Sequence, residues 1–153
     1  MKATVDAGAF FKALNRVIPL LRVSAIPALS EASIQFHNGV CTITATDLEL
    51  WVQTDIPAAG DDFGVVLSGT KSITKAGKFF RGPLTFSCAD AAVSSPQITM
   101  ACADKSAEFT GYPLRDYPEL PRFTCEQVYT ANAAQLLACI GRIKYAAQRR
   151  SDS

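Results

Sequence analysis

The sequence predicts an α+β fold in which an antiparallel sheet carries two helices on one face. Three observations predict it. The order strand, helix, several strands occurs twice before Gly111; both helical segments have one apolar side, which a sheet must cover; and the strands follow one another through short turns. The fold is therefore expected to be a β-α-β-β-β unit that is repeated.

The first strand and helix follow from local signals. Lys2 to Val5 alternates in the manner of a strand, and Asp6 is placed to cap a helix that continues to about Ile18. At 100° per residue Lys12 and Arg16 lie on one face of this helix. The opposite, apolar face comprises Phe10, Phe11, Leu14, Val17 and Ile18.

Ser33 to Asp47 predicts a β-hairpin, because Asn38-Gly39 is among the strongest short turn signals. Counting outward from the turn gives the cross-strand pairs Phe36–Cys41 and Ile34–Ile43. His37 lies beside the turn and is expected to be exposed to solvent rather than catalytic.

The remaining elements continue the alternation. Ala58-Ala59-Gly60 is interpreted as a turn between two strands, and Ser68-Gly69 as the start of a second helix, Thr70 to Phe80, which Arg81-Gly82-Pro83 ends. Tyr112 to Pro121 contains three prolines and is interpreted as a linker. The further strands are predicted at Leu48 to Ile56, Asp61 to Leu67, Leu84 to Ala89, Gln97 to Ala103 and Ala107 to Gly111.

The stretch Thr4 to Val17 recurs 126 positions later as Thr130 to Ile143, without a gap. Asp6 and Asn132 occupy the same capping position, and the apolar residues follow with the same spacing. A long-period repeat indicates a recurring module. We therefore expect one complete domain, residues 1–121, and in residues 122–153 the lead-in strand, at 123–129, and the helix of a second, incomplete one.

Composition excludes several classes of protein. The apolar fraction of 48% argues against disorder. No apolar run approaches the roughly 20 residues of a membrane span, and the N-terminus lacks the features of a secretory signal, so we expect a cytoplasmic protein. The cysteines have no CxxC spacing and are expected to be reduced, buried thiols, with no metal or other cofactor: Cys41, Cys88, Cys102, Cys125 and Cys139.

The net charge of +1 conceals a strongly uneven distribution. Of the 15 Lys and Arg, eleven fall in three helical segments, at 12–22, 71–81 and 142–150, where the acids are absent. An ordinary solvated helix face mixes both signs. The helices are therefore expected to present positive charge on the side away from the sheet, and the rest of the molecule to be acidic.

Four stretches resemble the bacterial sliding clamp, the β subunit of DNA polymerase III. They are the opening MKATVDAGAFFKALNRV, Ile26 to Leu29, Ile43 to Leu50 (ITATDLEL) and Tyr117 to Pro121. The resemblance covers the whole chain. It implies a DNA-clamp domain from a protein with three such domains per chain, two chains of which close head to tail into a ring around duplex DNA.

The resemblance also implies how the charges act. A clamp attracts DNA phosphates without reading bases, and its basic helices face the hole while the acidic sheet faces outward. Arg22 and Arg150 match family motifs best, whereas Lys144 projects toward the apolar side of its helix and is left out. The residues expected to face DNA are Lys12, Arg16, Arg22, Lys71, Lys75, Lys78, Arg142, Arg149 and Arg150.

Other partners follow from the resemblance. The full-length protein would tether DNA polymerase III and meet the clamp loader through a hydrophobic cleft that lies mainly in the third domain, which this chain lacks. Full-length chains would form the ring dimer. Because a lone first domain leaves sheet edges unpaired, an edge-paired or swapped dimer is expected of this chain.

Two other function classes remain open from the residues. As an enzyme, the chain offers carboxylate pairs for a metal, but no phosphate-binding glycine loop, nucleophile elbow or HExxH motif. As a small α+β scaffold, it could bind an acidic protein with its basic face. An accessory protein without catalytic residues is the preferred interpretation. The carboxylate pairs are Asp47 with Glu49, Asp61 with Asp62, and Asp116 with Glu119.

Overall fold

The structure is a computed structural model and describes residues 1–120, 124 and 127–144. The chain divides into two compact units, Met1–Leu120 and Pro121–Ser153, and each is considered by itself. No helix in the described part has the length and apolarity needed to cross a membrane.

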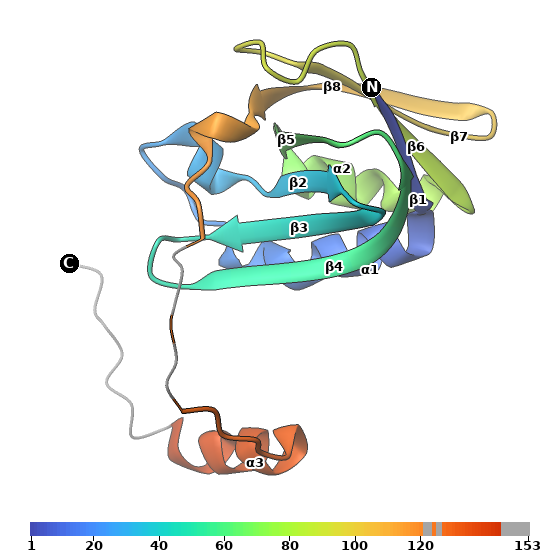
Figure 1. Ribbon diagram of the computed structural model, residues 1–153. Helices are drawn as coiled ribbons and strands as arrows, with labels where there is room; N and C mark the ends of the chain where they lie inside the picture. The colour runs from blue at the N-terminus through green and yellow to red at the C-terminus, as the bar shows by residue number, and fades with distance from the viewer. Residues whose placement is uncertain (121–123, 125–126, 145–153) are drawn as a thin grey trace. The chain divides into compact units, whose positions relative to one another are not determined.

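Unit 1 contains two β-α-β-β-β halves in sequence, β1-α1-β2-β3-β4 and β5-α2-β6-β7-β8 (Figure 1). This confirms the predicted α+β class and element order. The helices are α1 (Ala7–Val17) and α2 (Thr70–Ala76). The strands are β1 (Lys2–Asp6), β2 (Ser33–His37), β3 (Val40–Thr46), β4 (Trp51–Gly60), β5 (Phe63–Leu67), β6 (Pro83–Cys88), β7 (Gln97–Cys102) and β8 (Lys105–Pro113).

The sheet is a closed antiparallel barrel in the order β1-β4-β3-β2-β5-β8-β7-β6, with β6 pairing back to β1. The antiparallel sheet was predicted, but its closure into a barrel was not. Closure depends on 58–60, which do not form the predicted turn but continue β4 and pair with β1, Ala3 opposite Gly60. A Cβ on Gly60 would lie 2.3 Å from the carbonyl oxygen of Lys2, so glycine permits this close approach. Small residues thus let β4 curve around the barrel (Figure 1).

The β2–β3 hairpin is confirmed in position and register. Phe36 lies opposite Cys41 and Ile34 opposite Ile43, as predicted from the turn. Asn38 and Gly39 both have positive φ, as such a turn requires. His37 is exposed, as expected, with 62% of its side chain accessible.

β4 begins three residues later than predicted, because 47–50 form a turn. The Asp47 carboxylate accepts hydrogen bonds from the backbone N–H groups of Glu49 (3.2 Å) and Leu50 (2.8 Å). Leu48 has a φ of 74°, which a strand does not allow, and both leucines are exposed. A side chain that bonds the backbone two or three residues ahead competes with strand pairing.

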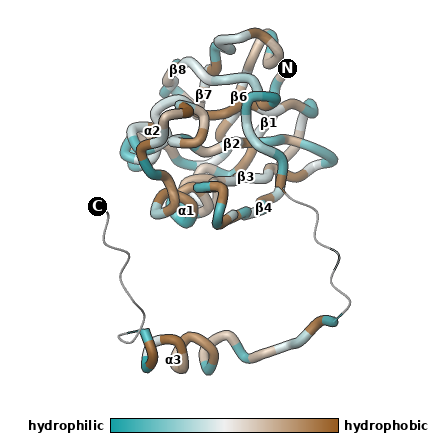
Figure 2. Tube along the Cα trace, turned by 90° about the vertical axis from the view of Figure 1, so that its left-hand side faces the viewer, coloured by the Kyte–Doolittle hydropathy of each residue, from teal (hydrophilic) through white to brown (hydrophobic). Residues whose placement is uncertain are grey.

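α1 supplies the centre of the core. Asp6 caps it as predicted, its carboxylate accepting from the N–H of Ala9 at 2.8 Å. Phe10 is fully buried, with its ring centroid 4.9 Å from that of Phe86 on β6. Figures 1 and 2 show α1 and α2 on the same side of strands β2 to β4.

α2 is shorter than predicted: it ends at Ala76, and a 3-10 turn covers Gly77–Phe79. Its first N–H groups are bonded by a residue distant in sequence. The Glu31 carboxylate accepts from the N–H of Gly69 at 2.9 Å and of Thr70 at 2.7 Å. A carboxylate at a helix N-terminus meets both the free donors and the positive end of the helix dipole. Glu31 therefore ties the first half of the barrel to the second.

The segment interpreted as a linker is largely part of unit 1. Tyr112 and Pro113 complete β8, and Leu114–Asp116 form a 3-10 turn. Tyr117 is 7% exposed and packs with Ala28 and Val66. Burial of an aromatic ring outweighs the preference of a proline-rich segment for solvent.

Unit 2 contains α3 (Ala133–Ile143), which confirms the repeated helix. The Asn132 side chain accepts from the N–H of Gln135 at 3.1 Å, in the position that Asp6 has on α1. The predicted lead-in strand at 123–129 is not formed at Thr124 or at 127–129, and its other residues lie outside the described part.

Three of the described cysteines are buried as expected, namely Cys41, Cys88 and Cys102, whereas Cys139 on α3 is exposed, which corrects the expectation for that thiol. Cys125 lies outside the described residues. None of the four described thiols forms a disulfide.

The burial of Cys41 predicts a loss of stability in alkaline solution. Desolvation, assisted by Asp55, raises the pKa of the Cys41 thiol from 9.0 to about 12. The unfolded chain ionises first, so this contribution is complete below pH 9 and is lost as the pH rises from 9 toward 12. By pH 11 about 2–3 kcal/mol should be lost. Urea unfolding of the wild type and Cys41→Ala at pH 7.5, 9 and 11 checks this, since the variant should lose less; parallel losses would contradict it.

Candidate nucleic-acid interface

The α1 cations lie on the face opposite the core. Lys12 and Arg16 are exposed. Phe10, Leu14 and Val17, on the other face of the same helix, are completely buried. Arg22 is exposed in the segment that follows. The 3.6-residue period of the helix therefore separates charge from core without any contribution from distant parts of the chain.

α2 and the 3-10 turn after it repeat this arrangement. Lys71, Lys75 and Lys78 are exposed, and Ile73 and Gly77 are buried. The Lys78 ammonium nitrogen lies 5.0 Å from the centroid of the exposed Phe79 ring, within the range of a cation–π contact. We call these exposed cations of 12–22 and 71–78 the basic helix surface.

A close contact brings the two halves of the basic helix surface together. The ring centroids of Phe11 on α1 and Phe80 are 6.1 Å apart, and the Phe11 ring packs over Gly77. A Cβ on Gly77 would come within 2.6 Å of the Phe11 ring. Glycine therefore sets how closely α2 approaches α1.

Replacing Gly77 by alanine should destabilise unit 1. The added methyl group must displace the buried Phe11 ring or push the helices apart, which costs about 1–3 kcal/mol as in other overpacked cores. Urea unfolding of Gly77→Ala measures the loss. The double variant Gly77→Ala/Phe11→Leu is the control, because a smaller side chain relieves the clash and the two losses should be less than additive. Additive losses would mean that the ring is not the obstacle.

The charge of the basic helix surface is not neutralised by nearby acids. Two ion pairs form among the residues that the structure describes, Lys105–Asp104 and Arg115–Asp116, and the His37 ring contacts the Asp62 carboxylate. None includes a cation of α1 or α2. Arg81 has a different role, since its guanidinium donates to the carbonyl oxygens of Gly77 (3.3 Å) and Phe80 (2.7 Å). Arg81 thus caps the end of the helical segment.

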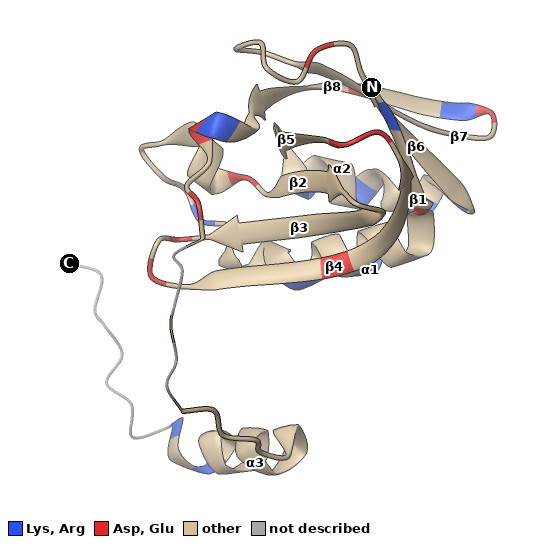
Figure 3. Ribbon diagram, in the orientation of Figure 1, with Lys and Arg blue, Asp and Glu red and all other residues tan. Residues whose placement is uncertain are grey.

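The acidic residues lie elsewhere. Asp55 is exposed on β4, and Glu108 on β8. Figure 3 shows acidic positions on the strands and loops toward the viewer and basic positions on the helices behind. Positive potential therefore builds up on one side of unit 1, where a polyanion would be attracted.

The remaining predicted DNA-facing residues belong to unit 2. Arg142 is in the last turn of α3 and is exposed within that unit. Arg149 and Arg150 lie outside the described residues. The structure therefore brings together only the predicted cations of α1 and α2, with Arg22 directly after α1.

The carboxylates do not form a metal centre. Asp47 and Glu49, considered as a metal-binding pair, belong to the turn before β4. Asp62 accepts from the N–H of Asn38 at 3.1 Å and lies 2.8 Å from the His37 ring, while Asp116 pairs with Arg115. Within the described part of the chain, no three His, Cys, Asp or Glu residues group around a common point.

Two features that shape this surface could not be predicted from the sequence. Glu31 holds the N-terminus of α2, and Gly77 sets the approach of the two helices. Neither had a local signal, because each acts on residues more than 35 positions away, such as Thr70 for Glu31 and Phe11 for Gly77.

Two β-α-β-β-β halves closed into one barrel, with adjacent basic helices, define a DNA-clamp domain. The particular likeness is to the β subunit of bacterial DNA polymerase III, the sliding clamp. That subunit from Pseudomonas aeruginosa superposes with a TM-score of 0.87 at 15% identity, over 99% of this chain and 41% of the other. The Streptococcus pneumoniae protein gives a TM-score of 0.85 at 15% identity, with the same coverages of 99% and 41%.

A sliding clamp from Bartonella birtlesii is 25% identical with a TM-score of 0.66, over 78% of this chain and 34% of the other. No family model and no curated protein matches the sequence. The chain thus has the sliding-clamp fold, as its sequence resemblance implied. It spans 34–41% of the length of these three clamps.

Proposed function

We propose that this chain is the N-terminal part of a sliding clamp, a processivity factor that encircles duplex DNA and tethers the replicative DNA polymerase. The observation that carries the proposal is the basic helix surface, whose cations have no acidic partner among the described residues and lie on one side of a clamp-fold barrel. The likeness to bacterial clamps supports the same role.

The physical mechanism is attraction without recognition. Lysine and arginine side chains on long flexible stems approach phosphates, and they release counterions without fixing on base edges. Each contact is weak, so the protein slides. Retention then depends on encirclement, which requires the ring that full-length clamp chains are proposed to form. Arg142, Arg149 and Arg150 are proposed to meet DNA phosphates as well.

Proposed partners are the DNA polymerase III core, the clamp loader and a second copy of the chain. β8 offers a surface for the second copy. Its residues 105–110 pair with β7, and it pairs with β5 at 111–113; within the described part of the chain no strand pairs with the other edge of 105–110. Open strand edges favour pairing with another chain. A dimer mass in light scattering supports edge pairing, and a monomer at high concentration argues against it.

The role proposed is that of an accessory subunit, not a catalyst. Three of the carboxylates considered for metal binding have other partners: Asp47 and Asp62 accept from backbone N–H groups, and Asp116 pairs with Arg115. A catalytic metal needs several such groups converging with an open coordination position.

Binding to plain duplex DNA at several salt concentrations tests the proposal. Fluorescence anisotropy with two unrelated 20-base-pair duplexes should give equal, weak affinities in the range of non-specific binding, about 10⁻⁴–10⁻⁶ M. The affinity should fall steeply with salt, with a slope of about −0.9 per phosphate contacted. No binding at low salt, together with binding to an acidic protein such as polyglutamate, would favour the scaffold function instead.

A further inference from the structure

The barrel wall is incomplete between β5 and β8. Their ladder contains three pairs and stops at Val65 opposite Pro113. Beyond Pro113 the chain turns into Leu114–Asp116, so within the part of the chain that the structure describes no strand pairs with Phe63 or Gly64 on this side.

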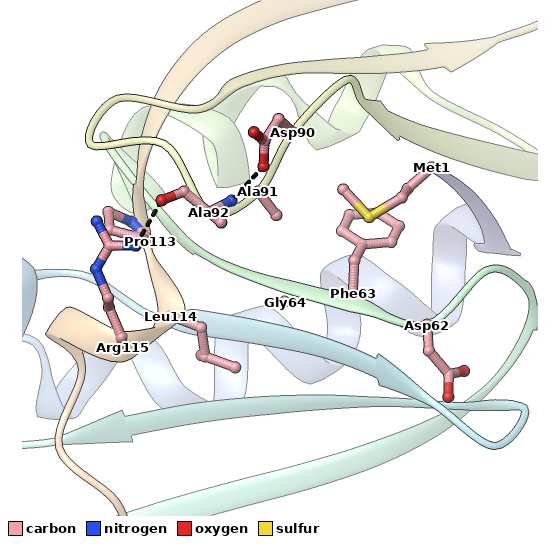
Figure 4. Close-up of a pocket in the computed structure, with 10 residues that line it drawn as sticks. All are labelled: Met1, Asp62, Phe63, Gly64, Asp90, Ala91, Ala92, Pro113, Leu114 and Arg115. Atoms are coloured by element: carbon pink, nitrogen blue, oxygen red, sulfur yellow. Dashed lines mark hydrogen bonds between the residues drawn. The ribbon is translucent and has the colours of Figure 1, made fainter.

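A cavity of about 450 Å³ occupies this position (Figure 4). The volume is within the range of ligand-binding pockets. The N-terminus, β5, the β6–β7 loop and the end of β8 all contribute to it. The lining residues that matter here are Met1, Phe63, Gly64, Ala92, Leu114 and Arg115.

The floor is apolar, and charged side chains lie around it, with Asp90 on the wall that the β6–β7 loop forms. In Figure 4 the Met1 side chain lies over the Phe63 ring, and Leu114 faces them across Gly64. Asp62 lies at one end and Arg115 at the other. A Cβ on Gly64 would lie 2.6 Å from a Leu114 methyl group, so glycine at this position makes room for the leucine.

The walls are held in place by their own hydrogen bonds. The Asp90 carboxylate accepts from the N–H of Ala92 at 2.8 Å, and the Arg115 guanidinium donates to the Ala92 carbonyl oxygen at 2.5 Å. The N-terminal ammonium of Met1 donates to the carbonyl oxygen of Cys88 at 2.9 Å. The pocket therefore exists without a ligand, which lowers the cost of binding.

The edge of β5 at the pocket has backbone hydrogen-bonding groups that no strand pairs with in the described part of the chain. The N–H of Leu67 donates to the Ala32 carbonyl oxygen, on the β2 side of β5. Backbone groups of successive strand residues point to opposite edges, so Val65 and Phe63 face β2 as well, while Gly64 directs its N–H and C=O toward the pocket. An extended peptide could bond to Gly64 there.

We propose that this pocket docks an extended peptide segment of a partner protein. The segment adds as a short strand beside Phe63–Gly64 and places one large aliphatic side chain between Met1, Phe63 and Leu114. Its basic neighbour lies toward Asp62, as the charge of that end favours. This site is separate from the basic helix surface and does not depend on the DNA-binding proposal.

The test uses the whole chain, labelled with ¹⁵N, and the capped peptide acetyl-Thr-Lys-Thr-Leu-Thr-Thr-amide. At concentrations up to about 1 mM, which detects weak complexes, the amide signals of Gly64, Ala91 and Leu114 should shift. The peptide with serine in place of leucine should not shift them. If neither peptide, or both equally, shifts these signals, the proposal is wrong.

Two controls separate docking from other effects. Ala92→Trp should fill the pocket and remove the shifts. Val93→Trp introduces the same residue at an exposed neighbouring position outside the lining and should leave the shifts unchanged. Two further peptides, N-methylated at the odd or at the even residues, distinguish strand addition from simple apolar docking. In an added strand only one of these two sets of N–H groups faces Gly64, so only one peptide should lose binding. Equal binding of both would show an apolar pocket without strand pairing and would overturn the proposed mode.

Discussion

Reversing the charge of Lys71, Lys75 and Lys78 to glutamate should abolish the binding of duplex DNA by this chain. These side chains are exposed on one stripe of α2 and its 3-10 extension, and no acidic residue in the described part of the chain pairs with them. In the wild type these three cations should account for about 2.7 of the slope of log K against log salt, at about 0.9 per phosphate contact. The added negative charges should then repel the duplex, so that no binding is measurable at the lowest salt used.

A matched control separates local charge from net charge. Lys2, Lys105 and Arg115 are exposed on β1, β8 and the 3-10 turn after β8, outside α1, α2 and the 3-10 turn that follows α2. Their triple reversal to glutamate changes the net charge by the same amount. It should weaken DNA binding only slightly. Equal losses in the two triple variants would mean that DNA responds to the overall charge, and the basic helix surface would no longer be the interface.

The largest expected effect on stability belongs to Phe10→Ala. Phe10 is fully buried. Its ring centroid lies 5.3 Å from that of Phe11 and 4.9 Å from that of Phe86. The truncation removes the anchor of α1 to β6 and leaves a cavity, which should cost about 3–5 kcal/mol of unfolding free energy. Urea unfolding monitored by circular dichroism measures it.

The control for this truncation is Phe79→Ala in the same unit. The Phe79 ring is 57% exposed and contacts Lys78, so its removal should cost less than about 1 kcal/mol. Comparable losses at the two positions would show that the core is not organised around α1. Because Phe10 faces away from the exposed cations, Phe10→Ala that remains folded should keep its salt-dependent DNA binding.

Much of the fold was predictable because its signals are local. Asp6 and Asn132 each bond an N–H three residues ahead, so the helix starts can be read from a few residues. Asn38-Gly39 fixes the register of its hairpin in the same way. The stripes of Lys and Arg follow from helix periodicity, which also set the side of each helix that became buried.

The sequence by itself thus determined the two β-α-β-β-β halves, the helix caps and the separation of charge from core. Only the tertiary structure decided that the sheet closes, that 58–60 belong to a strand and that Tyr117 is buried. It also decided that α1 and α2 meet at Gly77 and that a pocket remains beside Gly64. The physical reason is that these features arise between residues far apart in the chain, where no local propensity specifies the partner.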